Sequence, residues 1–287
     1  MRNSSAVGRL LLVVLTFVLV ATAAKTPKLT FKFTTIKVKG AQSTAIFGVN
    51  NAGAMVGSYV DQAGVQHGFR LVGGKVKKID DANGIGTSCF GINKAGAIVG
   101  YYFTSSYVAH AFLYQKGTFT EVGPANSTGS QAIGINDHGD INGNFGDSNG
   151  SHGFLLKGGA YSTIDVPGAS ATLGGGINNA DLLTEEWIDS SNNVESSLYD
   201  GKQYTTINVP GETDSYVSAI SKAGDIVYSW ETSEEYGGAL MHGGKFYKFH
   251  VPGGDRTWGY GINDHNEVVG AYTDQKGVLK GYSATYK

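Results

Sequence analysis

The chain has 287 residues, of which 43 are glycine, and only 16% of its residues are charged. Glycine is thus about twice as frequent as its usual share of roughly 7%, a composition that disfavours helices and favours short strands joined by tight turns. A net charge of −2, a hydrophobic content of 41% and a single cysteine exclude a disordered chain, a basic nucleic-acid-binding surface and a disulfide scaffold.

Residues 1–24 have the pattern of a secretory signal peptide. Arg2 and Arg9 precede an apolar run from Leu10 to Val20, and the segment ends in small residues that predict cleavage near Ala23 or Ala24. The alternative is a membrane anchor, but the run is shorter than the roughly 20 residues that a membrane-spanning helix needs. We therefore expect a secreted protein, either extracellular or held in the periplasm or cell envelope.

The remaining residues, 25–287, have a net charge of −4 and contain no second long apolar segment or basic cluster. We expect this part to have no membrane span, to bind no nucleic acid and to be monomeric. It contains six repeats, each marked by the tripeptide Gly-Ile-Asn or a variant of it. The last residues of these tripeptides, 42 or 43 positions apart, are Asn50, Asn93, Asn136, Asn178, Ser221 and Asn263.

Each repeat contains four short strand patterns. The first strand ends at the tripeptide, and an Asn-to-Gly turn leads to the second strand, which is 55–59 in the first repeat. The third strand begins with a His-Gly-Phe pattern at 67–69, and a Gly-Gly hairpin leads to the fourth, which is 161–167 in the third repeat. Four strands in about 40–45 residues is the period of a β-propeller blade.

The two ends of the chain predict how the ring closes. Residues 31–38 match a fourth strand and 279–286 match a third strand, so the last repeat lacks the strand that the N-terminal segment can supply. This pairing would hide two open sheet edges. The sequence therefore predicts an all-β, six-bladed β-propeller of four strands per blade, a single domain over 25–287. A β-solenoid is the alternative, but it does not predict one repeat divided between the two ends.

The recurring motif GINxxGxIVG, followed by HGF or HAF and by a strand end of the Thr-Ile-Asp-Val-Pro type, resembles the HAF family of bacterial extracellular repeats. The clearest copies are 91–100 with 110–112, and 134–143 with 152–154. The resemblance covers nearly all of 25–287 and implies a secreted bacterial protein, but it implies no activity. The fourth and fifth repeats depart from the pattern. Glu195 and Gly237 replace the histidine, and Asp181 stands where the turn glycine belongs.

The histidines that begin the third strands, His67, His110 and His152, suggest either a metal site or a structural role. Residues at equivalent positions of neighbouring blades should lie well over roughly 10 Å apart, which is too far for one shared ion. We therefore expect each histidine to anchor a strand by a hydrogen bond, and we predict neither a metal nor a cofactor. An aromatic column that includes Trp230, and a small-residue column that includes Cys89, predict buried packing.

Two features are candidate functional sites. Glu185 replaces a second-strand glycine, and with Glu186 it makes this part of the fourth repeat unusually acidic; paired carboxylates can perform glycosidase-type chemistry.

The second feature lies where the first strands of the fifth and sixth repeats begin. We expect these strand starts to lie beside the axis, on the face that carries the longest loops. Tyr216 and Trp258 can stack on a sugar ring or cap the channel, and Asp255 and Arg256 stand beside them. The sequence therefore favours a binding module for an extracellular glycan or protein. The alternative is a polysaccharide-active hydrolase or lyase that uses Glu185 and Glu186 as catalytic residues.

Overall fold

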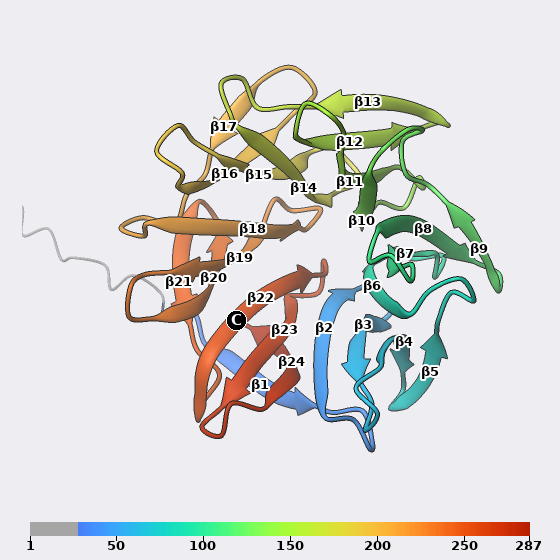
Figure 1. The fold of residues 1–287 in the computed structure, drawn as a ribbon. Helices are drawn as coiled ribbons and strands as arrows, with labels where there is room; N and C mark the ends of the chain where they lie inside the picture. Colours follow the sequence, from blue (N-terminus) through green and yellow to red (C-terminus); the bar gives the residue numbers. More distant parts are fainter. Residues whose placement is uncertain (1–27) are drawn as a thin grey trace, which may run out of the picture.

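The computed structural model describes residues 28–287, so the predicted signal peptide at 1–24 lies outside the described residues. The described residues form 24 strands in six four-stranded antiparallel sheets and contain no helix. Within them there is accordingly no helix of the length and apolar composition that could cross a membrane. Figure 1 shows the six sheets arranged as blades around a central axis, with the first strand of each blade innermost. The predicted six-bladed β-propeller is confirmed.

The first three blades follow one another along the chain. Blade 1 contains β2 (Ser43–Val49), β3 (Met55–Val60), β4 (Gln66–Val72) and β5 (Lys75–Ile79). Blade 2 contains β6 (Gly86–Ile92), β7 (Ile98–Phe103), β8 (Ala109–Gln115) and β9 (Thr118–Glu121). Blade 3 contains β10 (Gly129–Ile135), β11 (Ile141–Gly146), β12 (Ser151–Lys157) and β13 (Ala160–Ile164).

The last three blades include the one that closes the ring. Blade 4 contains β14 (Ala171–Ile177), β15 (Leu183–Ile188), β16 (Val194–Tyr199) and β17 (Tyr204–Thr206). Blade 5 contains β18 (Asp214–Ile220), β19 (Ile226–Glu231), β20 (Tyr236–His242) and β21 (Lys245–Phe249). Blade 6 contains β22 (Gly254–Ile262), β23 (Glu267–Asp274), β24 (Leu279–Tyr286) and β1 (Phe31–Ile36).

The N-terminal strand β1 pairs antiparallel with β24, from Phe31 opposite Tyr286 to Ile36 opposite Gly281. Figure 1 shows the blue β1 completing the red sixth blade. The predicted closure is thus confirmed, and both strands lose an edge that would otherwise be open to pairing with another chain.

The asparagine of the repeated tripeptide, where it is present, connects its blade to the next. The Asn50 side chain accepts hydrogen bonds from the backbone N–H groups of Ala52 and Ala54, both at 3.0 Å, and donates to the backbone oxygen of Asn93 at 2.9 Å. Equivalent links join blade 2 to 3, blade 3 to 4 and blade 4 to 5, and Asn263 of blade 6 donates to the backbone oxygen of Asn50 at 3.2 Å. In blade 5 the residue is Ser221, whose hydroxyl accepts a hydrogen bond from the backbone N–H of Asp225 in its own turn. This double role explains why the residue recurs.

The glycine of the second strand recurs because the innermost strand lies directly against it. A Cβ atom at Gly57 would lie 1.9 Å from the backbone oxygen of Ala45, and one at Gly100 would lie 2.0 Å from that of Ser88. A side chain at Gly57 or Gly100 would therefore require the two strands of these blades to shift.

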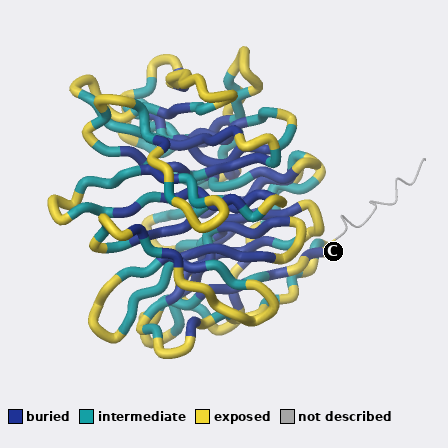
Figure 2. The backbone as a smooth tube through the Cα atoms, turned by 90° about the vertical axis from the view of Figure 1, so that its right-hand side faces the viewer, coloured by how far each residue is buried: buried dark blue, intermediate teal, exposed yellow. Residues whose placement is uncertain are grey.

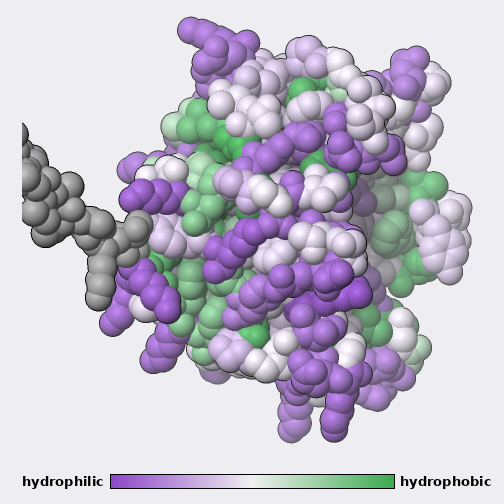
Figure 3. All heavy atoms as spheres, turned by 90° about the vertical axis from the view of Figure 1, so that its left-hand side faces the viewer, coloured by the Kyte–Doolittle hydropathy of each residue, from purple (hydrophilic) through white to green (hydrophobic). Residues whose placement is uncertain are grey.

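The core lies between the blades. Figure 2 shows buried backbone stacked in the middle of the molecule and exposed loops at its two faces. The phenylalanines of the His-Gly-Phe motif, such as Phe69 and Phe112, are fully buried, as is Cys89, while Trp230 is nearly so. The side of the ring seen in Figure 3 is mainly hydrophilic, with hydrophobic residues in separate small areas.

Candidate functional site

The axis of the ring contains a chamber of about 310 Å³, lined mainly by the innermost strands. In each blade a β-bulge or register irregularity lies at the third residue before the end of the tripeptide. A bulge can re-aim a side chain, and the residues at these positions line the chamber. They are Phe47, Phe90, Ile133, Gly175, Ser218 and Tyr260.

The chamber has one aromatic wall and one wall of smaller residues. The rings of Phe47 and Phe90 stack with their centroids 4.3 Å apart and their planes 5° from parallel, and the centroid of Tyr260 lies 5.1 Å from that of Phe47. These residues belong to blades 6, 1 and 2. Blade 4 lies opposite blade 1 in the ring (Figure 1), and there the bulge position is Gly175. Space is therefore left in front of blade 4.

Glu186 occupies that space, whereas Glu185 does not. Adjacent residues of a strand point to opposite faces, and only Glu186 lines the chamber. Desolvation by the surrounding protein raises the pKa of Glu186 to about 8. Glu185 is fully buried between blades 3 and 4, where its Oε1 accepts a hydrogen bond of 3.1 Å from Asn142 Nδ2. Burial raises the pKa of Glu185 well above its ordinary value.

The two predicted catalytic candidates, Glu185 and Glu186, therefore do not converge on one cavity. Glu186 is the single carboxylate among the described residues that line the chamber. The paired carboxylates that glycoside hydrolysis requires are not assembled there.

A second candidate site lies between blades 5 and 6. We call it the blade 5–6 cluster, and its members are Tyr216, Glu231, Tyr236, Arg256 and Trp258. The Glu231 carboxylate accepts hydrogen bonds from the hydroxyls of Tyr236 at 2.8 Å and Tyr216 at 3.3 Å. The Arg256 guanidinium lies over the Tyr236 ring, 4.2 Å from its centroid, and the Trp258 ring centroid lies 6.3 Å from that of Tyr236.

The cluster is accessible to solvent and contains one acidic residue, Glu231, and one basic residue, Arg256. Arg256 is exposed, while Tyr216, Glu231, Tyr236 and Trp258 are partly exposed. Burial raises the pKa of Tyr216, and the hydrogen bond to Glu231 raises the pKa of Tyr236, so both tyrosines keep their hydroxyl protons at neutral pH. Three aromatic residues, a carboxylate and a guanidinium are thus held together by mutual contacts.

Three of the four predicted ligand-binding residues, Tyr216, Arg256 and Trp258, belong to this cluster. The fourth, Asp255, is exposed beside it, with its Oδ2 4.0 Å from Arg256 Nε. Neither Tyr216 nor Trp258 is among the residues lining the chamber. The sequence does not indicate Tyr236 or the hydrogen bonds of Glu231, because these residues meet the others only when the hairpin between β19 and β20 folds back.

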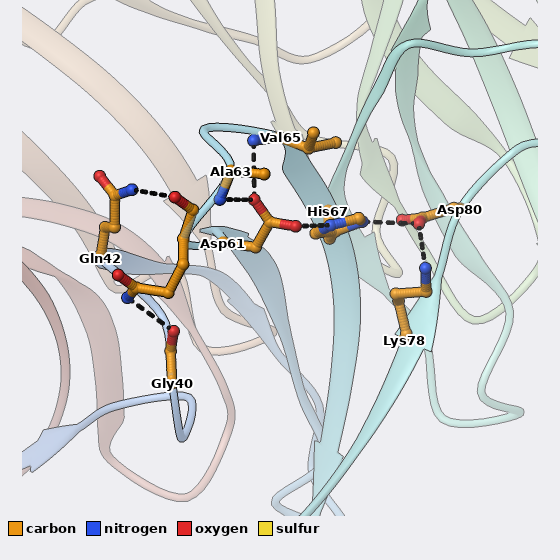
Figure 4. A network of polar contacts seen from close by, with 9 residues as sticks. Gly40, Gln42, Asp61, Ala63, Val65, His67, Lys78 and Asp80 are labelled. Carbon is orange, nitrogen blue, oxygen red and sulfur yellow. Dashed lines mark hydrogen bonds and ion pairs between the residues drawn. The ribbon is translucent and has the colours of Figure 1, made fainter.

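The histidines that begin the third strands are bound within their own blades. His67 Nδ1 lies 2.7 Å from Asp80 Oδ2 and its Nε2 lies 3.2 Å from Asp61 Oδ2, as Figure 4 shows. His152 likewise lies between Asp147 and Asp165, and His110 lies 2.9 Å from Glu121. Each histidine therefore ties the third strand to neighbouring segments of its blade, as the predicted anchor role requires.

One group of potential metal ligands brings His138, Asp140 and Asp181 together, with ligand atoms within 4.8 Å of one another. Both carboxylates already have partners. Asp181 pairs with Lys157 at 2.5 Å, and Asp140 accepts a hydrogen bond of 3.2 Å from Asn136. The structure thus shows Asp181 in an ion pair and Asp140 in a hydrogen bond.

The chain matches no protein-family model and no curated protein. Solved structures with a similar fold include the Aleuria aurantia lectin in complex with α-methyl-L-fucoside, with 13% identity, a TM-score of 0.54 and coverage of 88% of this chain and 96% of that one. The SapL1 lectin in complex with α-methyl fucoside has 13% identity, a TM-score of 0.56 and coverage of 85% and 93%. TolB from Acinetobacter baumannii has 10% identity, a TM-score of 0.58 and coverage of 81% and 66%. At such identities the likeness shows the propeller fold alone.

Proposed function

We propose that this protein is a carbohydrate-binding propeller that holds its sugar at the blade 5–6 cluster. The observation that carries the proposal is the convergence of Tyr236 and Trp258 with Glu231 and Arg256. A sugar offers an apolar C–H face that can pack on aromatic rings and hydroxyls that can bind charged groups. A few convergent polar groups beside aromatic surface is the usual composition of a small-molecule site.

The structural comparisons support a carbohydrate-binding function through the shared propeller fold. Two of the solved propellers described above are lectins in complex with α-methyl fucosides. A fucoside is therefore the first probe for this chain, and a wider glycan panel follows it. A protein partner was the other expectation, and the sugar is preferred because the cluster is small and concentrates aromatic and charged groups at one point.

The test is a glycan array followed by calorimetry on the purified protein. We expect at least one glycan to be retained, and Trp258→Ala and Glu231→Gln to weaken its binding at least tenfold, which corresponds to about 1.4 kcal/mol. Tyr107→Ala is the matched control, because Tyr107 is an aromatic residue with 79% exposure that lies outside the cluster. Retention of no glycan, or unchanged affinity in both variants, contradicts the proposal.

We further infer that the protein acts outside the cytoplasm, as an exported repeat protein of the HAF type. The support is the leader pattern at 1–24 and the repeated GINxxGxIVG and HGF motifs. Expression of the full sequence in a bacterium should yield a processed protein that begins near Ala24 or Lys25, measured by intact mass. An unprocessed cytoplasmic product contradicts the inference.

A further inference from the structure

The ring has two faces that differ in the connections they carry. In each antiparallel blade the turn after the first strand and the hairpin after the third strand lie at the same end, and the remaining connections lie at the other end. All six tripeptide turns line one cavity, so the blades share this orientation. We call the two ends the hairpin face and the loop face. Figure 2 shows the exposed connections gathered at these faces.

A lysine stands in or beside the hairpin of every blade that has one. These residues are Lys75, Lys116, Lys157, Lys202 and Lys245. In blade 6, which has no hairpin, Lys28 lies before β1 and Lys287 follows β24. All seven lysines are exposed. They are far apart in the sequence, and the fold brings them to the rim of one face.

Most of the positive charge at this rim is not neutralised. Lys75, Lys116 and Lys245 take part in no ion pair among residues 28–287. Lys157 pairs with Asp181, and Asp200 lies in the hairpin of Lys202. Nearer the axis, two lysines and two aspartates of the tripeptide turns balance one another, namely Lys94, Lys222, Asp137 and Asp264. The face therefore has a nearly neutral centre and a basic rim.

Lys116 occupies a backbone position that favours glycine. Its φ angle is 52°, and the corresponding residues of three other hairpins are Gly73, Gly158 and Gly243, with φ angles of 54° to 57°. A residue with a Cβ atom is disfavoured in this left-handed conformation. A lysine at such a position indicates that its side chain has a use that offsets the conformational cost.

The loop face has the opposite sign. Asp61, Asp147 and Asp189 begin loops after second strands, where hydrogen bonds from backbone N–H groups hold the pKa of each carboxyl below its ordinary value. These groups are therefore ionised at neutral pH. Glu234 and Asp255 add exposed carboxylates at the same face. The net charge of −2 is thus a sum over two unlike faces.

We propose that the hairpin face docks on an anionic phospholipid bilayer, with the hairpin lysines against the headgroup phosphates and the loop face turned away. A bilayer is a flat anionic surface, so it can meet the rims of several blades at once, and the attraction grows with each lysine near it. The acidic loop face would be repelled, which fixes the orientation. The blade 5–6 cluster, which lies at strand ends of the loop face, then faces away from the bilayer.

The arrangement of the lysines favours a surface over other anionic partners. A linear polyanion follows a continuous track of basic residues, whereas the hairpin lysines stand one to a blade around the circumference, where Figure 1 shows the third and fourth strands. A second copy of the chain, placed face to face, would bring one basic rim against another.

The experiment is flotation of the purified protein with vesicles. One set contains phosphatidylcholine with about 30% phosphatidylglycerol, and the other contains phosphatidylcholine alone. We expect binding to the anionic vesicles only. The partition coefficient should fall at least tenfold between roughly 50 and 300 mM NaCl, because salt screens charges at a distance.

A triple variant locates the docking face. It carries Lys75→Gln, Lys116→Gln and Lys245→Gln, and the partition coefficient should fall by up to about 100-fold, since each lysine near an anionic surface contributes roughly fivefold. The matched control removes the same charge from three exposed lysines of the loop face, with Lys37→Gln, Lys39→Gln and Lys276→Gln, and should bind as the wild type does.

Lys116→Gly separates docking from folding. Glycine suits the left-handed backbone at this position, so the variant should be at least as stable as the wild type in urea. Its binding to the anionic vesicles should nevertheless be weaker, by roughly fivefold. A purely structural lysine would not give this combination.

Equal binding to both kinds of vesicle, no binding to anionic vesicles at low salt, or equal losses in the two triple variants overturns the proposal. Retention on heparin without vesicle binding also overturns it and assigns the hairpin face to a linear polyanion. The wild-type comparison of the two vesicles decides the matter even if a variant fails to fold. Because sugar binding at the blade 5–6 cluster is measured with different ligands, either proposal can fail without the other.

Discussion

Blades 1 to 3, which we call the regular blades, differ from blades 4 and 5 in the residues that they have at equivalent positions. In the second strand, the regular blades have glycine, as at Gly57 and Gly100, where the innermost backbone leaves no room for a Cβ atom. Blades 4 and 5 have Glu185 and Tyr228 there, and both side chains are fully buried. The third strand of the regular blades begins with a histidine anchored by acidic residues, whereas blade 5 has Gly237 at this position.

This contrast indicates that the candidate site residues lie in the blades that depart from the repeat. In the regular blades the recurring side chains hold the blade together and connect it to its neighbour. In blades 4 and 5 the altered strands also carry Glu186 in the chamber and Glu231 in the blade 5–6 cluster. Blade 4 keeps the anchor in a changed form, because Asn208 donates a hydrogen bond to Glu195. Departures from the repeat are therefore substitutions with their own packing.

The largest effect is expected at Tyr228, where glycine would restore the repeat. The ring packs in the core cluster between blades 4 and 5, with its centroid 5.5 Å from that of Phe246. Tyr228→Gly should lower the free energy of unfolding by about 3–5 kcal/mol, as removal of a buried aromatic side chain typically does. Urea denaturation measures the change.

Tyr228→Phe is the matched control for that experiment. The buried hydroxyl of Tyr228 has no hydrogen-bond partner among residues 28–287, so its removal should leave stability unchanged or raise it by about 1 kcal/mol. If Tyr228→Gly is as stable as the wild type, the residue is a tolerated irregularity and the comparison between the two sets of blades loses its basis.

The fold was predictable from the sequence, whereas the sites were predictable only in part. The spacing from Asn50 to Asn263 determines the number of blades, and the unmatched strands at the two ends determine the closure. The chamber was not foreseen, because Phe47 and Tyr260 face the axis through β-bulges that simple alternation does not predict. Tyr236 was missed because it meets Arg256 only across two blades.

Glu185 provides the next test, because its carboxyl replaces a glycine inside the protein. Its raised pKa means that the native state holds this proton more tightly than the unfolded state does. Stability from this group is therefore greatest below the unfolded pKa of about 4.5 and declines as the pH rises toward the folded value.

Glu185→Gln should accordingly be more stable than the wild type at pH 8, with the difference narrowing toward pH 4.5. The loss in the wild type can reach about 1.4 kcal/mol for each unit by which the pKa is raised. Denaturation at three pH values measures the difference. Glu234→Gln, at an exposed position, should stay within about 0.5 kcal/mol of the wild type throughout. A constant difference between Glu185→Gln and wild type at all pH values would mean that the Glu185 carboxyl has the same pKa in the native and unfolded states.

The smallest effect is expected from the histidine anchor of blade 3. The hydrogen bond to Asp165, opposed by desolvation, raises the pKa of His152 above 6.5. The charged imidazole therefore contributes stability that is fully present below pH 6.5 and is lost as the pH rises through the folded pKa. Because the partners are partly exposed, the contribution should be no more than about 1 kcal/mol. His152→Asn should thus be less stable than the wild type at pH 5.5, and the gap should shrink at pH 8.5.

Glu195→Gln is the control in blade 4, where no imidazole occupies this position, and its effect should not change over the same range. A gap for His152→Asn that is equal at both pH values would show that the regular blades are anchored by geometry alone, without a contribution from charge.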